Sequence, residues 1–161
     1  MPIQMIAPKP IDLNHIRTMV DAALSATMTV VKLDFDLTTG SWESESKPKW
    51  DAAGPQTVGR AREMRYVTES TPFTWVDRGT KGPYPIPKVP KMKGTLAFQT
   101  GFVAKTIPRQ IGSRPGGSFG PWAFPKQVMH PGITPREFSI VISEEATGNL
   151  VRNMFVALGK I

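Results

Sequence analysis

The stretch "HPGITPREF", residues 130–138, predicts a tight turn followed at once by the start of a helix. Pro131 and Gly132 are residue types that form turns, because proline presets φ and glycine accepts a positive φ. We interpret His130 as a residue that orders this turn rather than as a catalytic base. The turn then sets the direction in which the chain enters its last helix.

A capping box predicts where that helix begins. Thr134 is expected at the N-cap and Glu137 at the third helical position, where the two side chains satisfy free backbone N–H groups. Pro135 suits the first helical position between them. Phe138 opens an apolar stripe with steps of three and four residues, so one long C-terminal helix is predicted, with a bend near Gly148.

A second helix is predicted near the other end of the chain. Asp12 is a suitable N-cap, and apolar residues from Leu13 to Val31 recur at helical spacing. We expect this helix to end between Val31 and Leu37, with Gly40 closing the connection. Residues 41–50 are interpreted as a strand or an extended ribbon. Three further segments between the helices are interpreted as strands: residues 57–70, 94–100 and 122–130. Turns are expected at two further places: Gly54-Pro55 and residues 72–76.

This order of elements predicts an α+β fold. We expect an antiparallel sheet with the N-terminal and C-terminal helices packed on one face, and long Pro/Gly-rich loops. The chain has 161 residues, with 16 Pro and 14 Gly, which suits one domain with stiff loops. Residues 1–11 are predicted to be an extended N-terminal lead, and residues 12–161 a single α+β domain.

Charge is distributed unevenly along the chain. The net charge is +7, yet residues 78–136 contain ten Lys or Arg and no Asp or Glu. Such a segment can contact nucleic-acid phosphates, contact acidic neighbouring proteins, or form a solvated basic face without a specific partner. The residues alone leave all three interpretations open.

The sequence contains no recognisable catalytic or metal-binding constellation. It has no cysteine, and its two histidines, His15 and His130, lie far apart, which argues against a zinc site. The glycine-rich residues 112–120 lack the Gly-Lys-Ser/Thr ending of a phosphate-binding loop. We therefore predict that the protein is not an enzyme and has no cofactor, and no apolar run is long enough to span a membrane.

Four motifs occur in order along the chain: "WVDRGTKGPYPIPK", "LAF", "AKTIPRQIGSRPGGSFG" and "HPGITPREF". Together they resemble the small neck and tail-completion proteins of tailed bacteriophages, the head–tail joining or minor tail proteins. The resemblance covers roughly residues 12–158. Ile133 and Glu137 depart from the family pattern, which often has Thr and Pro there, and residues 1–11 match nothing in it.

The resemblance implies a structural virion protein that forms a homo-oligomeric ring around the DNA path, at the head–tail junction or the tail end. Six copies are the family expectation. The implied partners are neighbouring neck and tail proteins, with possible non-specific contact to DNA in the lumen and no membrane. The implied location is the virion, after assembly in the host cytoplasm. A nucleic-acid-binding protein that uses the basic residues 78–136 is the alternative function.

Two groups of residues are predicted to matter for this function. Contacts with other subunits or partners are assigned to basic residues: Arg78, Lys81, Lys88, Lys91, Lys93, Lys105, Arg109, Arg114 and Arg136. The turn and the helix start are assigned to a second set: Gly79, His130, Pro131, Gly132, Thr134, Glu137 and Phe138. A positive charge at Arg136 would oppose the helix dipole in the first turn, so its side chain is expected either to have an acidic or carbonyl partner elsewhere or to point to solvent.

Overall fold

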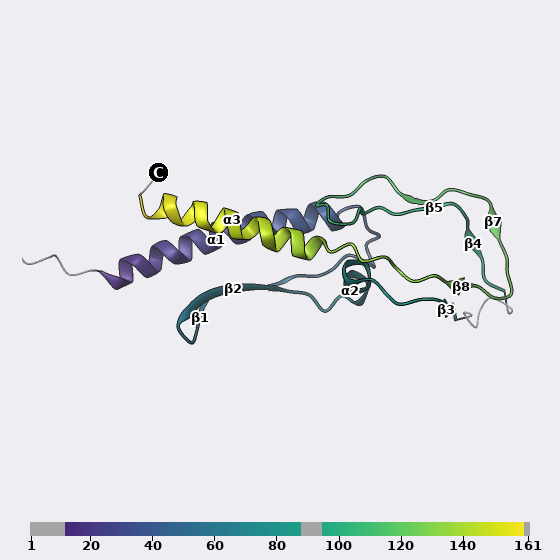
Figure 1. Ribbon diagram of the computed structural model, residues 1–161, viewed down its shortest axis with the longest axis horizontal. Coiled ribbons are helices and arrows are strands. Elements are labelled where there is room, and N and C mark those ends of the chain that lie inside the picture. Colours follow the sequence, from purple (N-terminus) through teal and green to yellow (C-terminus); the bar gives the residue numbers. More distant parts are fainter. Residues whose placement is uncertain (1–11, 88–94, 160–161) are drawn as a thin grey trace, which may run out of the picture.

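The computed structural model describes residues 12–87 and 95–159 and is elongated (Figure 1). Two long helices lie at one end with a β-hairpin beside them, and a long arm of extended chain projects at the other end. The predicted lead, residues 1–11, lies outside the described residues. The elements follow in this order: α1 (Leu13–Thr39), β1 (Asp51–Val58), β2 (Ala61–Val67), α2 (Thr71–Arg78), β3 (Tyr84–Pro85), β4 (Phe98–Gln99), β5 (Phe102–Val103), β6 (Gly117–Ser118), β7 (Trp122–Ala123), β8 (Met129–His130) and α3 (Phe138–Ala157).

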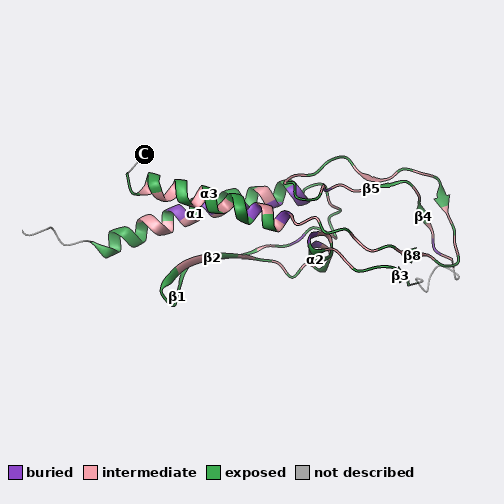
Figure 2. Cartoon of the chain, in the orientation of Figure 1, coloured by how far each residue is buried: buried purple, intermediate pink, exposed green. Residues whose placement is uncertain are grey.

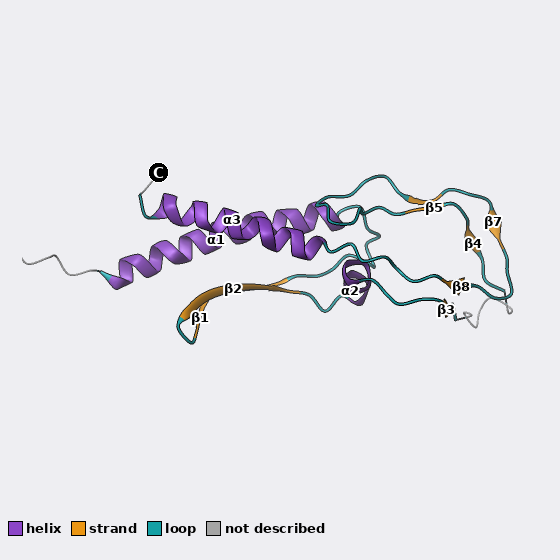
Figure 3. Ribbon diagram, in the orientation of Figure 1, coloured by secondary structure: helices purple, strands orange, loops and turns teal. Residues whose placement is uncertain are grey.

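The antiparallel helices α1 and α3 form the body of the molecule (Figure 3). Asp12 caps α1 as predicted, because its carboxylate accepts the backbone N–H groups of Asn14 and His15 at 3.0 and 3.1 Å. α1 continues to Thr39, past the expected end, and α3 passes through Gly148 as one helix. Both predicted helices are therefore present, and the first is longer than its apolar stripe indicated.

The hydrophobic core is small and combines residues of α1, α2 and α3. It consists of five buried side chains: Val31, Phe35, Phe73, Phe138 and Ile142. Phe73 of α2 packs edge-on against Phe138 of α3, with ring centroids 5.3 Å apart. Trp50 packs against Phe35, with ring centroids 4.3 Å apart. Phe138 is fully buried, which stabilises the fold by about 1.5–3 kcal/mol relative to an exposed side chain.

β1 and β2 form an antiparallel hairpin beside α1. The predictions of a strand or extended ribbon over residues 41–50 and of a turn at Gly54-Pro55 are wrong. Residues 41–50 form turns and irregular chain, whereas Gly54-Pro55 lies inside β1, where the register with β2 shifts. Such an irregularity accommodates a proline that cannot donate to the ladder. The chain reverses instead at Gly59, whose φ of 60° favours glycine.

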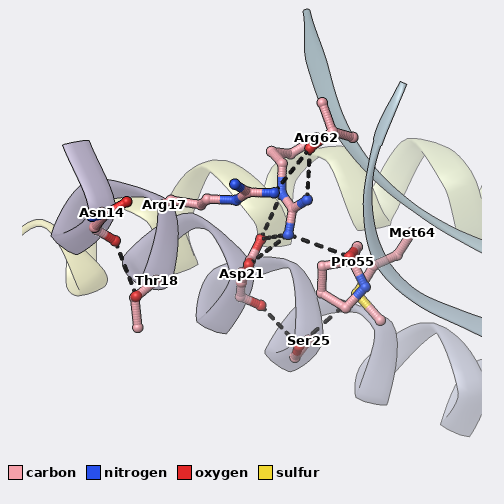
Figure 4. Close-up of polar contacts among 9 residues, drawn as sticks. Asn14, Arg17, Thr18, Asp21, Ser25, Pro55, Arg62 and Met64 are labelled. Atoms are coloured by element: carbon pink, nitrogen blue, oxygen red, sulfur yellow. Dashed lines mark hydrogen bonds and ion pairs between the residues drawn. The ribbon is translucent and has the colours of Figure 1, made fainter. Parts of the chain in front are cut away.

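Arg62 of β2 attaches the hairpin to α1 (Figure 4). Its Nη2 lies 2.6 Å from each carboxylate oxygen of Asp21, and its Nη1 donates to the Thr57 hydroxyl at 2.9 Å. The side chains of Arg62 and Asp21 are 19% and 30% exposed. Because the pair is partly shielded and doubly hydrogen-bonded, it stabilises the fold more than an ordinary surface ion pair.

α2 forms where the sequence predicted only an apolar turn, at residues 72–76. The hydroxyl of Ser70 caps the helix by accepting the N–H of Phe73 at 3.3 Å. The same Phe73 side chain enters the core. A helix of eight residues shows little periodicity in sequence, so its formation depends on this cap and on the burial of one aromatic ring.

α3 begins later than the capping box predicts. Phe138 is its first residue, and Glu137 at the N-cap has a φ of 55° and makes no capping bond. The prediction that Thr134 and Glu137 form a capping box is therefore wrong. The reason lies in α2, because the N–H groups of Arg136 and Glu137 donate to the carbonyl of Asp77 at 3.0 and 2.9 Å. These bonds hold the chain in a non-helical path up to Phe138.

The α+β fold class is confirmed, with helices near both ends and antiparallel pairing between the strands. The arrangement differs from a single sheet. The described residues contain four two-stranded sheets: β1–β2, β3–β8, β4–β7 and β5–β6. The helices α1 and α3 pack chiefly on each other, and α1 also contacts the hairpin. Among residues 12–87 and 95–159, no helix has the length and apolar character needed to cross a membrane.

Candidate interaction surface

Residues 79–87 and 95–136 form the arm, which leaves the body after α2 and returns to it before α3 (Figure 1). In its described part, a first ribbon pairs residues 80–86 with 128–133. A second ribbon pairs residues 96–105 with 114–125. A ribbon of only two strands presents open edges and is marginally stable in water. The arm is therefore the part of the molecule that most needs further contacts.

Two glycines allow the first ribbon to close tightly where it meets the body. Gly79 has a φ of 77°, and a Cβ there would lie 2.6 Å from the carbonyl oxygen of Ile133. Gly132 has a φ of 98°, and a Cβ there would lie 2.5 Å from the carbonyl oxygen of Thr80. Both positions were predicted as turn residues, and both require glycine for its conformation and its lack of a side chain.

His130 orders the turn, as the sequence predicted. Its Nδ1 accepts the backbone N–H of Gly132 at 3.0 Å. Its ring stacks on Tyr84 of the opposite strand, with centroids 5.0 Å apart and planes inclined by 17°. The histidine thus joins the two strands of the first ribbon and holds the start of the turn at Pro131.

The basic residues predicted to contact partners fall into three groups. The first group lies outside the described residues: Lys88, Lys91 and Lys93. The second is bonded within the chain: Lys105, Arg109 and Arg114. The third, within residues 12–87 and 95–159, has no side-chain hydrogen bond or ion pair: Arg78, Lys81 and Arg136. That any of them contacts another subunit stays a prediction.

Lys105 and Arg109 connect the base of the second ribbon to the body through hydrogen bonds and ion pairs. Lys105 donates to the carbonyl of Ser41 at 2.9 Å and to Glu43 at 3.0 Å. Arg109 donates to Glu137 at 3.0 Å, so the Glu137 carboxylate serves this ion pair instead of the predicted cap. These cations therefore have a structural role that an unbroken basic segment did not reveal.

A groove of about 500 Å³ opens between the bases of the two ribbons. Its lining is largely apolar and includes Trp42, Val76, Phe102 and Ile133. The charged residues at the groove are Glu43, Lys105 and Arg136. Phe102 is 72% exposed. In a single chain this apolar lining is therefore open to water, which is unfavourable unless another molecule covers it. The side chain of Arg136 lies at this groove and has no acidic partner among the described residues.

Exposed residues occur along the whole molecule (Figure 2), and many of them are large and apolar. Among the described residues, seven apolar side chains are buried whereas 21 large ones are exposed. Eight of the exposed ones belong to the arm: Tyr84, Phe98, Phe102, Val103, Phe119, Trp122, Phe124 and Met129. Exposed apolar surface that extends over several elements marks sites of interaction in soluble proteins.

Asp34 of α1 and Glu145 of α3 lie close enough for their carboxylates to repel each other. Burial raises the pKa of Asp34 above its ordinary value, and the negative charge of Glu145 raises it further. Neither carboxylate forms an ion pair with a described residue. A pair of uncompensated negative charges at this position favours the approach of a cation.

Three features of the structure were not predicted. They are the hydrogen bonds that the Asp77 carbonyl accepts from Arg136 and Glu137, the Asp34–Glu145 pair, and the bonds of the arm cations within the chain. Each depends on residues that are distant in sequence, so no local pattern could have indicated it. In the described ranges, no group of three or more His, Cys, Asp or Glu side chains could hold a metal ion. Comparisons with protein-family models, curated protein sequences and solved structures gave no match.

Proposed function

We propose that this chain is a structural protein of a tailed-bacteriophage virion, assembled as a ring at the head–tail junction or the tail end. The observation that carries the proposal is the arm. Its ribbons expose aromatic side chains such as Phe119 and Trp122, which are 71% and 60% exposed. A strand pair of this kind becomes stable when neighbouring copies cover its faces and edges.

The asymmetry of the molecule supports a ring rather than a simple dimer. The arm projects from one end of an elongated body, and its charge differs from that of the body (Figure 1). When two different surfaces of a chain bind each other, the interface is heterologous, and repeated copies close into a ring if the rotation permits. Six copies, the DNA path in the lumen, and neck and tail proteins as neighbours follow from the resemblance stated above.

The mass of the particle in solution tests this proposal. Light scattering after size-exclusion chromatography would be measured for the full chain, alone and mixed with neck and tail proteins of the same particle. The expected result is a closed oligomer, in one or both conditions. A chain that stays monomeric in both would contradict the proposal.

A matched pair of variants tests the role of the arm. We expect the double variant Phe119→Ser, Trp122→Ser to lose the oligomer while keeping its helix content, because these side chains contribute to contacts between copies. Val67→Ser is the control, since Val67 is also 52% exposed but lies in the hairpin. Equal assembly of both variants would exclude the arm aromatics from the interface.

The alternative function, non-specific binding of nucleic acid, is favoured by the cations of the arm and of the adjoining end of α2 that have no described partner. Arg78, Lys81 and Lys126 are exposed, as phosphate contacts require. The alternative predicts duplex binding whose affinity falls steeply with salt. Titration of labelled duplex DNA at low and high salt would check this, and negligible affinity at low salt would exclude it.

A further inference from the structure

One side of α1 is left uncovered in the single chain. The hairpin covers a second side, where Arg17, Asp21 and Ser25 contact residues of β1 and β2. α3 covers a third, where Asn153 donates to Thr27 at 3.0 Å. The remaining side of α1 faces neither element. At its C-terminal end Gly112 and Ser113 bond to the Thr38 hydroxyl and the Leu37 carbonyl, while the Leu37 side chain stays exposed.

This open side carries an apolar stripe. Val30, Leu33 and Leu37 follow the spacing i, i+3 and i+7, which places them on one face of the helix. They are 38%, 57% and 54% exposed. Asp34 lies beside them at the seam with α3, next to Glu145. We call this surface the α1 face. It consists of Val30, Leu33, Asp34 and Leu37 of α1 with Glu145 of α3, and it is apolar with a negatively charged edge.

The charges of the arm and the body are complementary. The segment of residues 78–136, which comprises Arg78 at the end of α2 and the arm, carries ten Lys or Arg without an acid, a formal charge of +10. The other residues carry ten Lys or Arg and all 13 Asp or Glu, a formal charge of −3. Opposite charges steer the arm of one copy towards the body of another, and like charges keep two arms apart.

The residues of the arm that best match the α1 face are Trp122–Lys126. Trp122 and Phe124 are 60% and 65% exposed, and Lys126 directly follows them. Lys126 is exposed and forms no ion pair with a described residue. β7 also lies near the outer end of the arm, far from the body of its own chain (Figure 1). This stretch can therefore reach a neighbouring copy without bending the arm.

We propose that Trp122–Lys126 of one copy docks on the α1 face of the next copy. Trp122 and Phe124 cover the apolar stripe of α1, and Lys126 pairs with the carboxylates of Asp34 and Glu145. The interface is heterologous, since each copy offers its arm to one neighbour and its α1 face to the other. This inference rests on the proposed function and specifies which surfaces join in the ring.

Cysteine cross-linking tests the contact directly, because the chain contains no cysteine. Full chains with Lys126→Cys would be mixed with full chains carrying Glu145→Cys and treated with a short bis-maleimide. Glu145 is exposed, so the thiol is accessible. The control partner is Val67→Cys, which is 52% exposed and lies in the hairpin, on another side of α1.

We expect a covalent heterodimer from the Lys126→Cys and Glu145→Cys mixture, at least tenfold more abundant than from the Val67→Cys control. Equal yields, or no heterodimer at high protein concentration, would overturn the docking inference. If the chain still forms a closed oligomer by light scattering, only the docking inference fails. If no oligomer forms either, alone or with neck and tail proteins, the proposed function fails with it.

Charge reversal provides an independent readout. Lys126→Glu should weaken self-association. Mixing this variant with chains that carry both Asp34→Lys and Glu145→Lys should restore the association. Restoration would not occur if Lys126 only supported the fold of its own arm. Far-UV circular dichroism of each variant would confirm that the helices are retained, so that loss of association reflects the interface.

Discussion

The carboxylate of Asp77, near the end of α2, accepts hydrogen bonds from both the backbone N–H and the hydroxyl of Ser139 in the first turn of α3. The two residues are 62 positions apart, and Asp77 is only 5% exposed. A buried negative charge at a helix N-terminus is also favourable towards the helix dipole. Because the arm begins after α2 and ends before α3, this pair closes the arm at its root.

We expect Asp77→Ala to lower the free energy of unfolding by about 2–3 kcal/mol, because hydrogen bonds to a charged acceptor contribute about 1.5–3 kcal/mol. Urea unfolding followed by far-UV circular dichroism would measure the loss. Ser139→Ala is the matched control, since it keeps the backbone bond and should cost only about 1 kcal/mol. A stability for Asp77→Ala equal to that of the wild type would show that the cap is unimportant.

The hairpin is expected to depend on Arg62. Replacing Arg62 with Ala removes the bidentate pair with Asp21 and should cost about 1–2 kcal/mol, with faster hydrogen exchange in β1 and β2. Arg65→Ala is the control, because Arg65 is 59% exposed and pairs only with Glu63, at 2.9 Å. That variant should lose about 0.5 kcal/mol or less. Hydrogen exchange that is unchanged in Arg62→Ala would mean that the hairpin is held by other contacts.

Two glycine substitutions should change the free energy of unfolding in opposite directions. Gly79→Ala forces a side chain into a positive φ and against the carbonyl oxygen of Ile133, so we expect a loss of about 1–3 kcal/mol. Gly148→Ala meets no atom within 4 Å and lies inside α3, so it should stabilise the chain by about 0.5–1 kcal/mol. Thermal unfolding of dilute protein would compare them. Destabilisation by Gly148→Ala would show that the α3 surface is constrained at this position.

The Asp34 carboxyl should make the free energy of unfolding decrease as pH rises. The folded chain binds the Asp34 proton more tightly than the unfolded chain, because burial and Glu145 raise its folded pKa above 3.8. The free energy of unfolding therefore falls as pH increases from about 3.8 through the folded pKa. Asp34→Asn removes this penalty, so the variant should be slightly more stable than the wild type at neutral pH.

Urea unfolding of Asp34→Asn and the wild type at several pH values would check this. The difference should disappear below the unfolded pKa, where Asp34 is protonated in both states. Asp36→Asn is the comparison on the same helix, because Asp36 pairs with Lys32. An advantage of Asp34→Asn that persists unchanged in acid would mean that the carboxylate charge is not its cause.

The local signals in the sequence were sufficient for some elements. The Asp12 cap and the apolar spacing of α1 act within a few residues, so the helix could be recognised without its surroundings. The same holds for the turn, where His130 bonds to a residue two positions away. The two long helices, the α+β class and the ordered turn were thus predictable.

Other elements were misjudged because distant residues compete with local ones. Gly54-Pro55 has the composition of a turn, yet pairing with β2 holds it inside a strand. The Ser70 cap and the burial of Phe73 make a helix of a segment too short to show helical periodicity. From the sequence, the basic residues of the arm formed one group of predicted partner contacts. In the structure, Lys105 and Arg109 are bonded to acids of the body.

The sequence by itself determined the two helical stripes, the histidine-ordered turn and the separation of a +10 segment from the remaining −3. These are properties of neighbouring residues and of composition. Only the tertiary structure decided where α3 begins, which cations are already paired and which apolar side chains remain exposed. The physical reason is that each of these depends on contacts between parts of the chain that are far apart in sequence, as Asp77 and Ser139 are.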